Sequence, residues 1–380
     1  MTAGKEELSV YNVTDVSNTA FSDAVKVIRK FIVPFIVFVG LCGNTISLIV
    51  FSTRRMRRAS SSVFLTALAI VDNLFLLSLL MSWLDDEVHG IIYSNLSCQL
   101  LIYVTYVTSF LSVWCIVGFS CQRYIAICYP LKHKVYCTVF REKLIICTFA
   151  LGASVLYTFN FWTSEIRQGV GAAVDFECAF KREYMGFLTV ATWIDTLFTM
   201  IIPFIVIAFV NTLVLRKKAH FPIQKMFSDR FLRKRYIETN LSDQITCNTD
   251  SLSSSVEAHL NHEIRREHPN RNRKVLLIKR SRITTTLLAV SFTFLVLNLP
   301  AHTIRLYNLL TAALNNEYFV PVRHYLIQEL TNMLYCTTFS CNFFLYTLFG
   351  RNFKSTLLLL VKCHSTKNVY RPSLCVISKL

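Results

Sequence analysis

Residues 63–84 read VFLTALAIVDNLFLLSLLMSWL, a run of 22 residues in which Asp72 is the only charged side chain. A helix needs about 20 consecutive apolar residues to cross the roughly 30 Å hydrocarbon core of a bilayer. We therefore predict a membrane-spanning helix over about residues 60–84. Asp72 falls near its middle, where an ionisable group is expensive and is by default a hypothesis for a functional site.

Six more apolar segments of similar length occur along the chain. The seven predicted spans cover about residues 28–53, 60–84, 96–128, 143–163, 186–216, 282–309 and 324–349. Hydrophobic residues make up 53% of the chain and charged residues only 17%, whereas about 25% of the residues of a soluble protein are charged. The predicted fold is an all-α membrane protein, a single seven-transmembrane helix bundle over residues 28–349.

Positive charge gathers in four connections that all fall on one side of this bundle. The clusters are Arg54 to Arg58; Lys132, Lys134, Arg141 and Lys143; Arg216 to Lys218, Arg233 to Arg235 and 271–282; and Arg351, Lys354 and Lys362. Loops rich in Lys and Arg face the cytoplasm. We therefore expect a multi-pass plasma-membrane protein with an extracellular N-terminus. The net charge of +17 is then explained by the basic cytoplasmic connections and does not indicate nucleic-acid binding.

Three segments lie outside the predicted spans. Residues 1–27 are predicted as an extracellular tail that lacks a cleaved signal peptide, and they include the glycosylation sequon at Asn12. Residues 217–274 are polar without an apolar period, which predicts a long and mostly disordered cytoplasmic loop. Residues 350–380 are predicted as a short amphipathic eighth helix and a tail. Cys363 is there either palmitoylated or a free surface thiol.

Two of the thirteen cysteines map clearly to the oxidising outer side, Cys98 and Cys178. We predict a disulfide between them. It would close a loop of about 80 residues, and such a loop stabilises the fold by roughly 4 kcal/mol in the chain-entropy model. The bridge would pin the second outer loop over the bundle.

Polar side chains inside the spans cluster by depth. Asp72, Ser112 and Asn342 fall on similar levels, and Asn44 lies midway along the first span. An acid with several neutral oxygens at one depth suits a hydrated sodium ion, or equally a structural hydrogen-bond network. We expect no other cofactor and no other metal.

Two further features concern the inner ends of the helices and their bends. Arg123 lies 25 residues after Cys98, about 37 Å along one helix at a rise of about 1.5 Å per residue. Pro203 and Pro300 interrupt spans five and six, where they either kink the helices or are tolerated in the packing.

Together these residues resemble the class A (rhodopsin-like) G-protein-coupled receptors over nearly the whole chain. The matching motifs are Gly43-Asn44, Leu68-Ala69-x-x-Asp72, Cys98 with Cys178, Gln122-Arg123-Tyr124, Pro203, Phe294 with Pro300, Asn342-x-x-x-Tyr346, and Phe353 with Lys354. The phrase from Cys341 to Tyr346 is most similar to invertebrate neuropeptide receptors of the FMRFamide type.

The chain departs from the family pattern at several motif positions. Gln122 stands where the family has an acid, and Lys279, Arg280 and Arg282 surround the place of the span-six acid. Both acidic partners of Arg123 are therefore absent, which predicts raised basal signalling. Asn298 replaces the usual span-six tryptophan, Phe343 the span-seven proline, and Asn211 the span-five tyrosine.

The resemblance implies a ligand pocket that opens outward between spans three, five, six and seven. The predicted pocket residues are Thr105, Tyr106, Trp193, Asp195, His302, Arg305, Gln328, Glu329 and Asn332. This mixture of acids, a base and aromatics suits a peptide. The alternative for each side chain is that it faces lipid headgroups or neighbouring side chains. Asp195 or Glu329 would pair with a ligand arginine.

The resemblance further implies a receptor rather than an enzyme. Ligand binding would favour a second bundle arrangement in which span six pivots near Pro300, Phe294 repacks and Tyr346 rotates inward. A heterotrimeric G protein would then dock against Arg123 and Tyr124. The alternatives are a class A receptor for a non-peptide ligand, a chemosensory receptor without G-protein coupling, and a transporter or channel.

Overall fold

The computed structural model describes residues 3–57, 62–88, 91–168, 176–217, 288–311 and 322–366. The elements in chain order are α1 (Ala3–Ser52), α2 (Arg54–Arg57), α3 (Ser62–Val88), α4 (Asn95–Cys128), α5 (Pro130–Tyr136), α6 (Val139–Leu156), α7 (Asn160–Thr163), β1 (Ser164–Gln168), β2 (Phe176–Phe180), η1 (Arg182–Tyr184), α8 (Met185–Thr196), η2 (Leu197–Ile201), α11 (Val322–Phe349) and α12 (Arg351–Thr366). Helices also cover residues 202–217 and 288–311. The predicted disordered loop over 217–274 lies outside the described residues after residue 217.

Six helical segments are long and apolar enough to cross a membrane. They are Ala20–Ser52, Ser62–Val88, Asn95–Cys128, Val139–Thr163, Arg182–Lys217 and Leu288–Thr311. The seventh helix, α11, has 28 residues and therefore the necessary length, but it carries more polar side chains. Hydrogen bonds from Tyr335 to Ser109 and from Asn342 to Asp72 hold it among the others. The predicted bundle of seven helices is confirmed.

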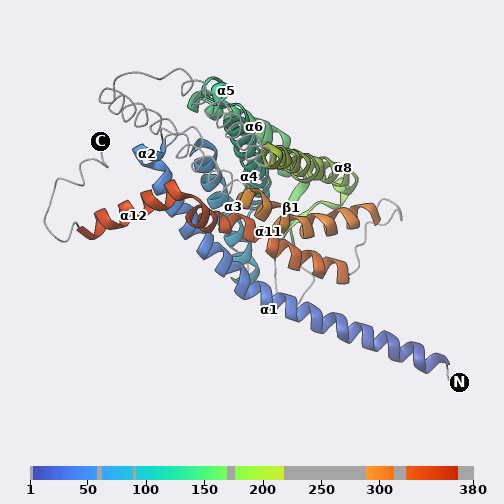
Figure 1. Ribbon diagram of the computed structural model, residues 1–380. Helices are drawn as coiled ribbons and strands as arrows, with labels where there is room; N and C mark the ends of the chain where they lie inside the picture. Colours follow the sequence, from blue (N-terminus) through green and yellow to red (C-terminus); the bar gives the residue numbers. More distant parts are fainter. Residues whose placement is uncertain are drawn as a thin grey trace, which may run out of the picture.

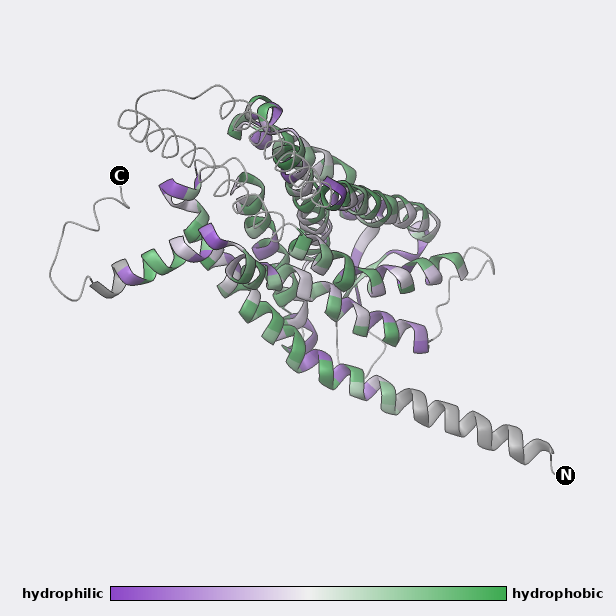
Figure 2. Cartoon of the chain, in the orientation of Figure 1, coloured by the Kyte–Doolittle hydropathy of each residue, from purple (hydrophilic) through white to green (hydrophobic). Residues whose placement is uncertain are grey.

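The helices turn apolar side chains outward and polar side chains inward. In α1, Phe31, Phe35 and Phe38 are exposed, whereas Asn44 and Ser47 are fully buried. Figure 2 shows hydrophobic residues along the length of the helices. A hydrocarbon core satisfies no backbone N–H or C=O group, so each segment must satisfy its own by forming a helix. The polar side chains then find partners only inside the bundle.

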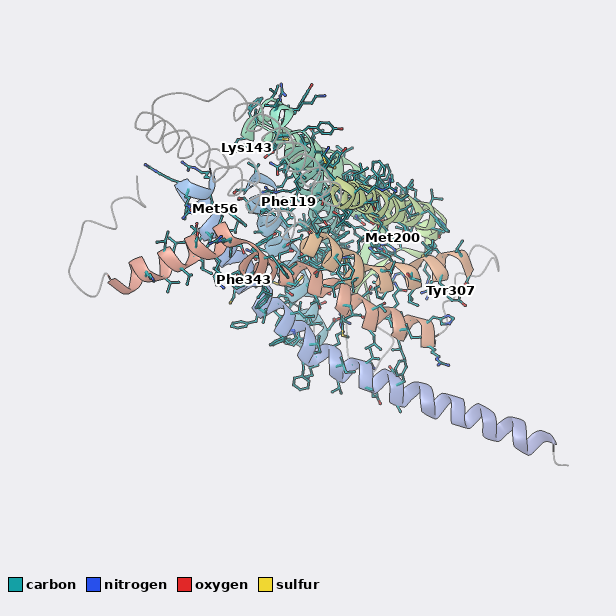
Figure 3. All side chains as sticks on the ribbon, in the orientation of Figure 1. Met56, Phe119, Lys143, Met200, Tyr307 and Phe343 are labelled. Atoms are coloured by element: carbon teal, nitrogen blue, oxygen red, sulfur yellow. A yellow bond between two sulfur atoms is a disulfide. The ribbon has the colours of Figure 1, made fainter. Side chains whose placement is uncertain are left out.

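Close helix contacts depend on small residues. α1 packs against α3 and α11, and α3 packs against α4. Gly43 of α1 faces Phe343, where an added Cβ would lie 2.9 Å from the Phe343 Cβ. Figure 3 shows Phe343 and Phe119 among the packed helices, with Met56 toward the end that carries α2 and α5.

A hairpin lies against one end of α4 (Figure 1). β1 and β2 pair antiparallel, with Ile166 opposite Cys178. Cys178 forms the predicted disulfide with Cys98, at a Cα–Cα distance of 5.5 Å. The backbone N–H of Ile166 also donates to Oδ1 of Asn95 at 2.9 Å. The prediction of a bridge that pins this loop to the third span is confirmed.

Several helix limits differ from the predicted spans. α1 is helical from Ala3, so residues predicted as a tail continue the first helix, since no proline precedes Pro34. The fourth span ends at Leu156 and resumes as the short α7. A π-helical turn, η2, precedes Pro203 in the fifth span, whereas the helix over 288–311 passes through Pro300 without a break. Proline removes one backbone donor, and a π turn is one local adjustment to that loss.

Glycine packing can be tested by adding one methyl group. We expect Gly118→Ala to lower the apparent melting temperature of the purified protein, because the new Cβ would overlap the Phe64 ring, and overpacking of this kind costs about 1–3 kcal/mol. Gly152→Ala is the matched control, because no atom lies within 4 Å of its added Cβ. Equal melting temperatures for the two variants would contradict the packing described here.

Candidate functional site

A cavity of about 680 Å³ opens between the helices near the hairpin. Eight of the nine predicted pocket residues line it, namely Thr105, Tyr106, Asp195, His302, Arg305, Gln328, Glu329 and Asn332. Trp193 is not among the lining residues, so its role in ligand binding stays a prediction. It lies two residues before Asp195 on α8, about 200° around the helix from it.

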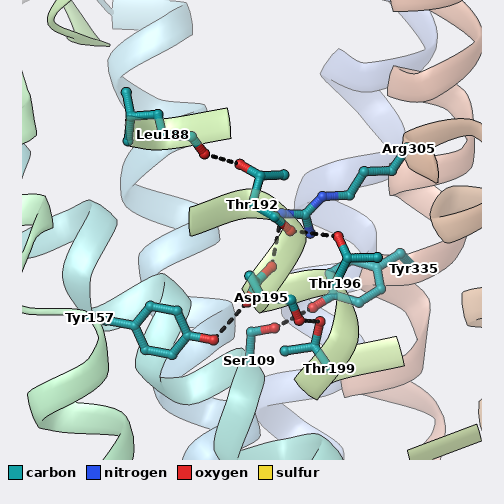
Figure 4. A network of polar contacts seen from close by, with 9 residues as sticks. All are labelled: Ser109, Tyr157, Leu188, Thr192, Asp195, Thr196, Thr199, Arg305 and Tyr335. Atoms are coloured by element: carbon teal, nitrogen blue, oxygen red, sulfur yellow. Dashed lines mark hydrogen bonds and ion pairs between the residues drawn. The ribbon is translucent and has the colours of Figure 1, made fainter. Parts of the chain in front are cut away.

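Asp195 joins three helices through its two carboxylate oxygens. The Tyr157 hydroxyl donates to Oδ1 at 2.6 Å, and the Arg305 Nη2 lies 2.8 Å from Oδ2. Asp195 is 6% exposed and Tyr157 is 1% exposed, so water has little access to this contact. Figure 4 shows Asp195 between Tyr157 and Arg305. The two charges predicted to face ligand groups are thus paired with each other.

The local structure explains how these groups meet. Tyr157 follows the end of α6, and Asp195 lies in the last turn of α8 beside η2. The hydroxyls of Thr192 and Thr199 bond back to the carbonyls of Leu188 and Asp195. These hydroxyl bonds leave the Asp195 carboxylate to Tyr157 and Arg305 (Figure 4).

The floor of the cavity carries a histidine without hydrogen bonds. His302 is 5% exposed, and neither of its ring nitrogens has a hydrogen-bond partner among the described residues. Phe204 and Tyr335 present their rings to it, with centroids 6.2 and 5.8 Å away. The Tyr335 hydroxyl is 2.5 Å from Ser109 Oγ and is therefore already engaged.

One acid of the cavity has no direct partner. Glu329 is partly buried and makes no hydrogen bond and no ion pair within the described part of the chain. Its neighbour Gln328 accepts a hydrogen bond from Asn308 at 2.8 Å. Arg29 also lines the cavity and pairs with Asp86 at 2.6 Å. Sequence reasoning missed Arg29, whose only signal is its place at the outer start of the first span.

A second polar site lies at the middle of the bundle. Ser112 donates to Oδ1 of Asp72 at 2.6 Å, and Asn342 donates to Oδ2 at 2.8 Å. Asp72 is 0% exposed. Asn44 belongs to the same predicted group but donates to the Phe339 carbonyl at 2.9 Å instead, and its Oδ1 has no partner among the described residues.

The inner end of α4 carries a polar contact that the sequence analysis did not predict. Gln122 Nε2 donates to Oε1 of Glu142, a buried acid at the start of α6. No hydrogen bond or ion pair joins Arg123 to Glu142 within the described residues, so the absence of an acidic partner for Arg123 stays a prediction. Tyr124 packs edge-on against Tyr129 at a centroid distance of 6.0 Å.

The remaining predicted residues pack against neighbouring helices. Phe294 is buried and meets Phe204 edge-on at 5.7 Å. Asn298, one turn before His302, donates to Thr338 of α11 at 3.1 Å. Tyr346 is already buried against Phe51 and Phe353, with ring centroids 5.5 and 5.7 Å away.

Three sequence predictions concern residues about which the structure says little. Asn12 and Cys363 lie in α1 and α12, but their side chains are outside the described set. The basic residues around Arg280 also lie outside the described residues. Glycosylation and palmitoylation therefore stay predictions.

The chain matches the family described as 7 transmembrane receptor (rhodopsin family) over residues 43–346. It is 30% identical to the mouse thyrotropin-releasing hormone receptor over 122 residues, about a third of either chain (32% and 31%). It is 29% identical to the rabbit growth hormone secretagogue receptor type 1 over 168 residues, 42% of this chain and 45% of that one. A probable G-protein coupled receptor of Caenorhabditis elegans is 26% identical over 299 residues, 75% of this chain and 79% of that one.

These matches bear on the sequence predictions. The predicted resemblance to class A receptors is confirmed, and so is the expectation of a receptor rather than an enzyme. The resemblance to FMRFamide-type receptors stays a prediction.

The Asp195–Arg305 pair can be tested by a double-mutant cycle on thermal stability. We expect Asp195→Asn and Arg305→Gln each to lower the apparent melting temperature, because each leaves a partly or fully buried charge without its partner. The double variant should lose less than the sum of the two. Asp86→Asn is the control at an exposed pair, where a loss of about 0–1 kcal/mol is expected. Strict additivity would refute a coupling between Asp195 and Arg305.

Proposed function

This chain belongs to the rhodopsin family of seven-transmembrane receptors, and from that premise we propose that it binds an extracellular peptide and activates a heterotrimeric G protein. The observation that carries the proposal is the 680 Å³ cavity, which combines apolar walls with charged and amide side chains. A peptide offers backbone amides, charges and apolar side chains together. Such a lining suits it better than it suits a purely apolar molecule.

The orientation in the plasma membrane follows from charge. Arg54, Arg55 and Arg57 lie at one end of the bundle, in α2, and Asp85 and Glu87 lie at the opposite end of α3. Basic connections favour the cytoplasmic side. The N-terminus, the hairpin and the cavity then face the exterior, and membrane lipid surrounds the apolar outer face.

The names of the relatives support a ligand of the hormone class. Two of them are receptors for thyrotropin-releasing hormone and for growth hormone secretagogues. The chain spans less than half the length of these relatives in the matched regions, so the ligand is inferred from the cavity itself.

The cavity favours a ligand with a cationic group. Asp195 is neutralised by Arg305, and Arg29 is engaged by Asp86. Glu329 is the cavity acid left for a ligand within the described residues, and a carboxylate binds an arginine or amine through charge-assisted hydrogen bonds. Arg305 keeps further N–H groups that can donate to a ligand carbonyl or carboxylate.

His302 favours an amide group at the deep end of the ligand. A neutral imidazole carries one donor and one acceptor. A terminal carboxamide or an amide side chain offers the complementary acceptor and donor. The Phe204 and Tyr335 rings would enclose it.

Activation would reach the inner end through span six. The Phe294–Phe204 contact and the Asn298–Thr338 hydrogen bond join span six to spans five and seven below the cavity. A ligand that binds a second arrangement more tightly shifts the population toward it. Pivoting near Pro300 would then open the inner end around Arg123 and Tyr124, with Tyr346 supporting the open state.

The middle polar site fits a sodium ion. Asp72, Ser112 and Asn342 supply a carboxylate, a hydroxyl and an amide oxygen, the hard donors that such an ion prefers. An unpartnered Oδ1 on buried Asn44 also suits this role. The ion would favour the closed arrangement by holding α3, α4 and α11 together.

The inner end offers a surface for a protein partner. Leu131 of α5 is 83% exposed, and Val135 and Phe140 are exposed beside it. Lys132 and Arg141 border these apolar side chains. Exposed apolar groups with a polar rim are typical of interaction sites, which supports G-protein docking there.

A reporter assay tests the function as a whole. Cells that carry the chain and a promiscuous G protein are given a library of amidated peptides. We expect a nanomolar response that Arg123→Ala abolishes at equal surface expression. A response that persists in Arg123→Ala would argue against coupling through that residue.

The ligand chemistry is tested at Glu329. We expect Glu329→Gln to lower the potency of an arginine-containing agonist by about tenfold or more, because a charged partner is lost. Glu183→Gln makes the same chemical change at an exposed outer residue that does not line the cavity, and should leave potency unchanged. An unchanged dose–response curve in Glu329→Gln would exclude the proposed pairing.

The amide contact is tested at His302. His302→Phe should weaken the binding of an amidated agonist more than the binding of the same peptide with a free carboxylate.

A further inference from the structure

Two hydroxyl groups join spans three and six toward the inner end of the bundle. The Oγ atoms of Ser120 in α4 and Ser291 in the helix over 288–311 lie 3.3 Å apart, within hydrogen-bond distance, and either can donate. Both residues are 0% exposed. The side chains directly before them, Phe119 and Val290, are buried in one apolar cluster. The contact is therefore a polar link in an apolar part of the bundle.

A serine inside a helix does not need a partner on another helix. The hydroxyl of Ser78, also buried, donates at 3.0 Å to the carbonyl of Leu74, four residues back in α3. Any helical serine can form such a bond, and it joins no other helix. Ser120 and Ser291 instead meet across two helices, although they are 171 residues apart in the chain. This bond therefore depends on how the two helices are placed.

Four polar residues of span six lie on one face of the helix. They are separated by seven, four and three positions, which places them within an arc of about 60° at about 100° per residue. The set is Ser291, Asn298, His302 and Arg305. Asn298 donates to Thr338 of α11, and Arg305 pairs with Asp195 of α8. This face thus meets different helices at different levels, and Ser291 is its member nearest the inner end.

Ser291 lies on the part of span six that would move. It is nine residues before Pro300, about 14 Å along the helix at a rise of about 1.5 Å per residue. A swing of about 10° at Pro300 would therefore shift Ser291 by roughly 2 Å. Since a donor–acceptor distance of about 3.6 Å is already too long for a hydrogen bond, even this small outward swing separates Ser291 from Ser120.

We propose that Ser120 and Ser291 form an inner clasp, a hydrogen bond that holds span six in the closed arrangement and breaks when the bundle opens toward a G protein. The proposal rests on the proposed function, because that function requires span six to pivot. Both serines are positioning residues, since they act through the place of span six relative to Arg123, three residues after Ser120. The competing role is structural only, in which the hydroxyls satisfy each other and favour neither arrangement.

The first test removes each hydroxyl in turn. At equal surface expression, we expect Ser120→Ala and Ser291→Ala each to raise ligand-independent signalling about threefold, the factor that an average hydrogen bond between membrane helices contributes to an equilibrium. The double variant should signal no more than the single variants, because all three lose the same bond. Ser78→Ala is the matched control and should signal at the wild-type level, because its hydroxyl bonds only within α3 among the described contacts.

A second measurement does not depend on the G protein. Cys121 is a free, partly buried thiol directly after Ser120. In detergent, maleimide labelling of Cys121, followed by mass spectrometry, should be several-fold faster in either alanine variant than in the wild type or in Ser78→Ala. If neither the wild type nor any variant signals but labelling follows this order, the proposed function fails while the clasp stands.

Three outcomes would overturn the proposal. Alanine variants that lower the melting temperature but leave signalling and Cys121 labelling unchanged would make the two serines structural residues only. A double variant whose signalling rises by the product of the two single effects would show that the hydroxyls act separately. Labelling that rises equally in Ser78→Ala would trace the effect to any lost buried hydroxyl. If one alanine variant fails to reach the surface, the other carries the test, because each removes the same bond.

Discussion

The burial of polar side chains in a bundle surrounded by lipid is the constraint on which this structure depends. Hydrocarbon offers no hydrogen bonds, so a polar side chain within the membrane must face the inside of the bundle and find its hydrogen-bond partner on a neighbouring helix. The partners occur at three depths, at Asp195 with Arg305, at Asp72 with Asn342, and at Gln122 with Glu142. Each contact joins two different helices, and together the contacts specify how the helices are rotated relative to one another.

One helix contributes to all three depths. α4 carries Ser109 beside the cavity, Ser112 on Asp72, and Gln122 on Glu142. A disulfide holds its outer end to the hairpin. α4 is therefore the fixed element of the bundle. The helix over 288–311 has the Arg305–Asp195 ion pair beside the cavity, and further along it contacts its neighbours through single hydrogen bonds and ring edges, as at Asn298 and Phe294, which suits an element that pivots.

The sequence predicted how deep residues lie in the bundle better than it predicted which face of a helix they occupy. Apolar length located five of the seven spans to within four residues at each end, and equal depth brought Asp72, Ser112 and Asn342 together correctly. Trp193 was chosen by its depth and does not line the cavity, because depth does not say which face of α8 a residue occupies. Asp195 and Arg305 were both placed at the cavity, but their pairing depends on the rotation of two helices. The sequence analysis missed Glu142 because this residue lies among basic residues at the start of a helix, where a single acid belongs to no distinctive pattern.

The disulfide also imposes an order on biosynthesis. Cys178 emerges from the ribosome 80 residues after Cys98, so the bridge closes only after the intervening fourth span has been inserted. In the proposed orientation, the Cys98 thiol would remain unpaired until then in the oxidising lumen of the endoplasmic reticulum. Chaperones and thiol oxidoreductases that act during this interval decide whether Cys98 pairs with Cys178 or with a foreign thiol. Yield in a heterologous host should therefore depend on that folding machinery as well as on the stability of the finished bundle.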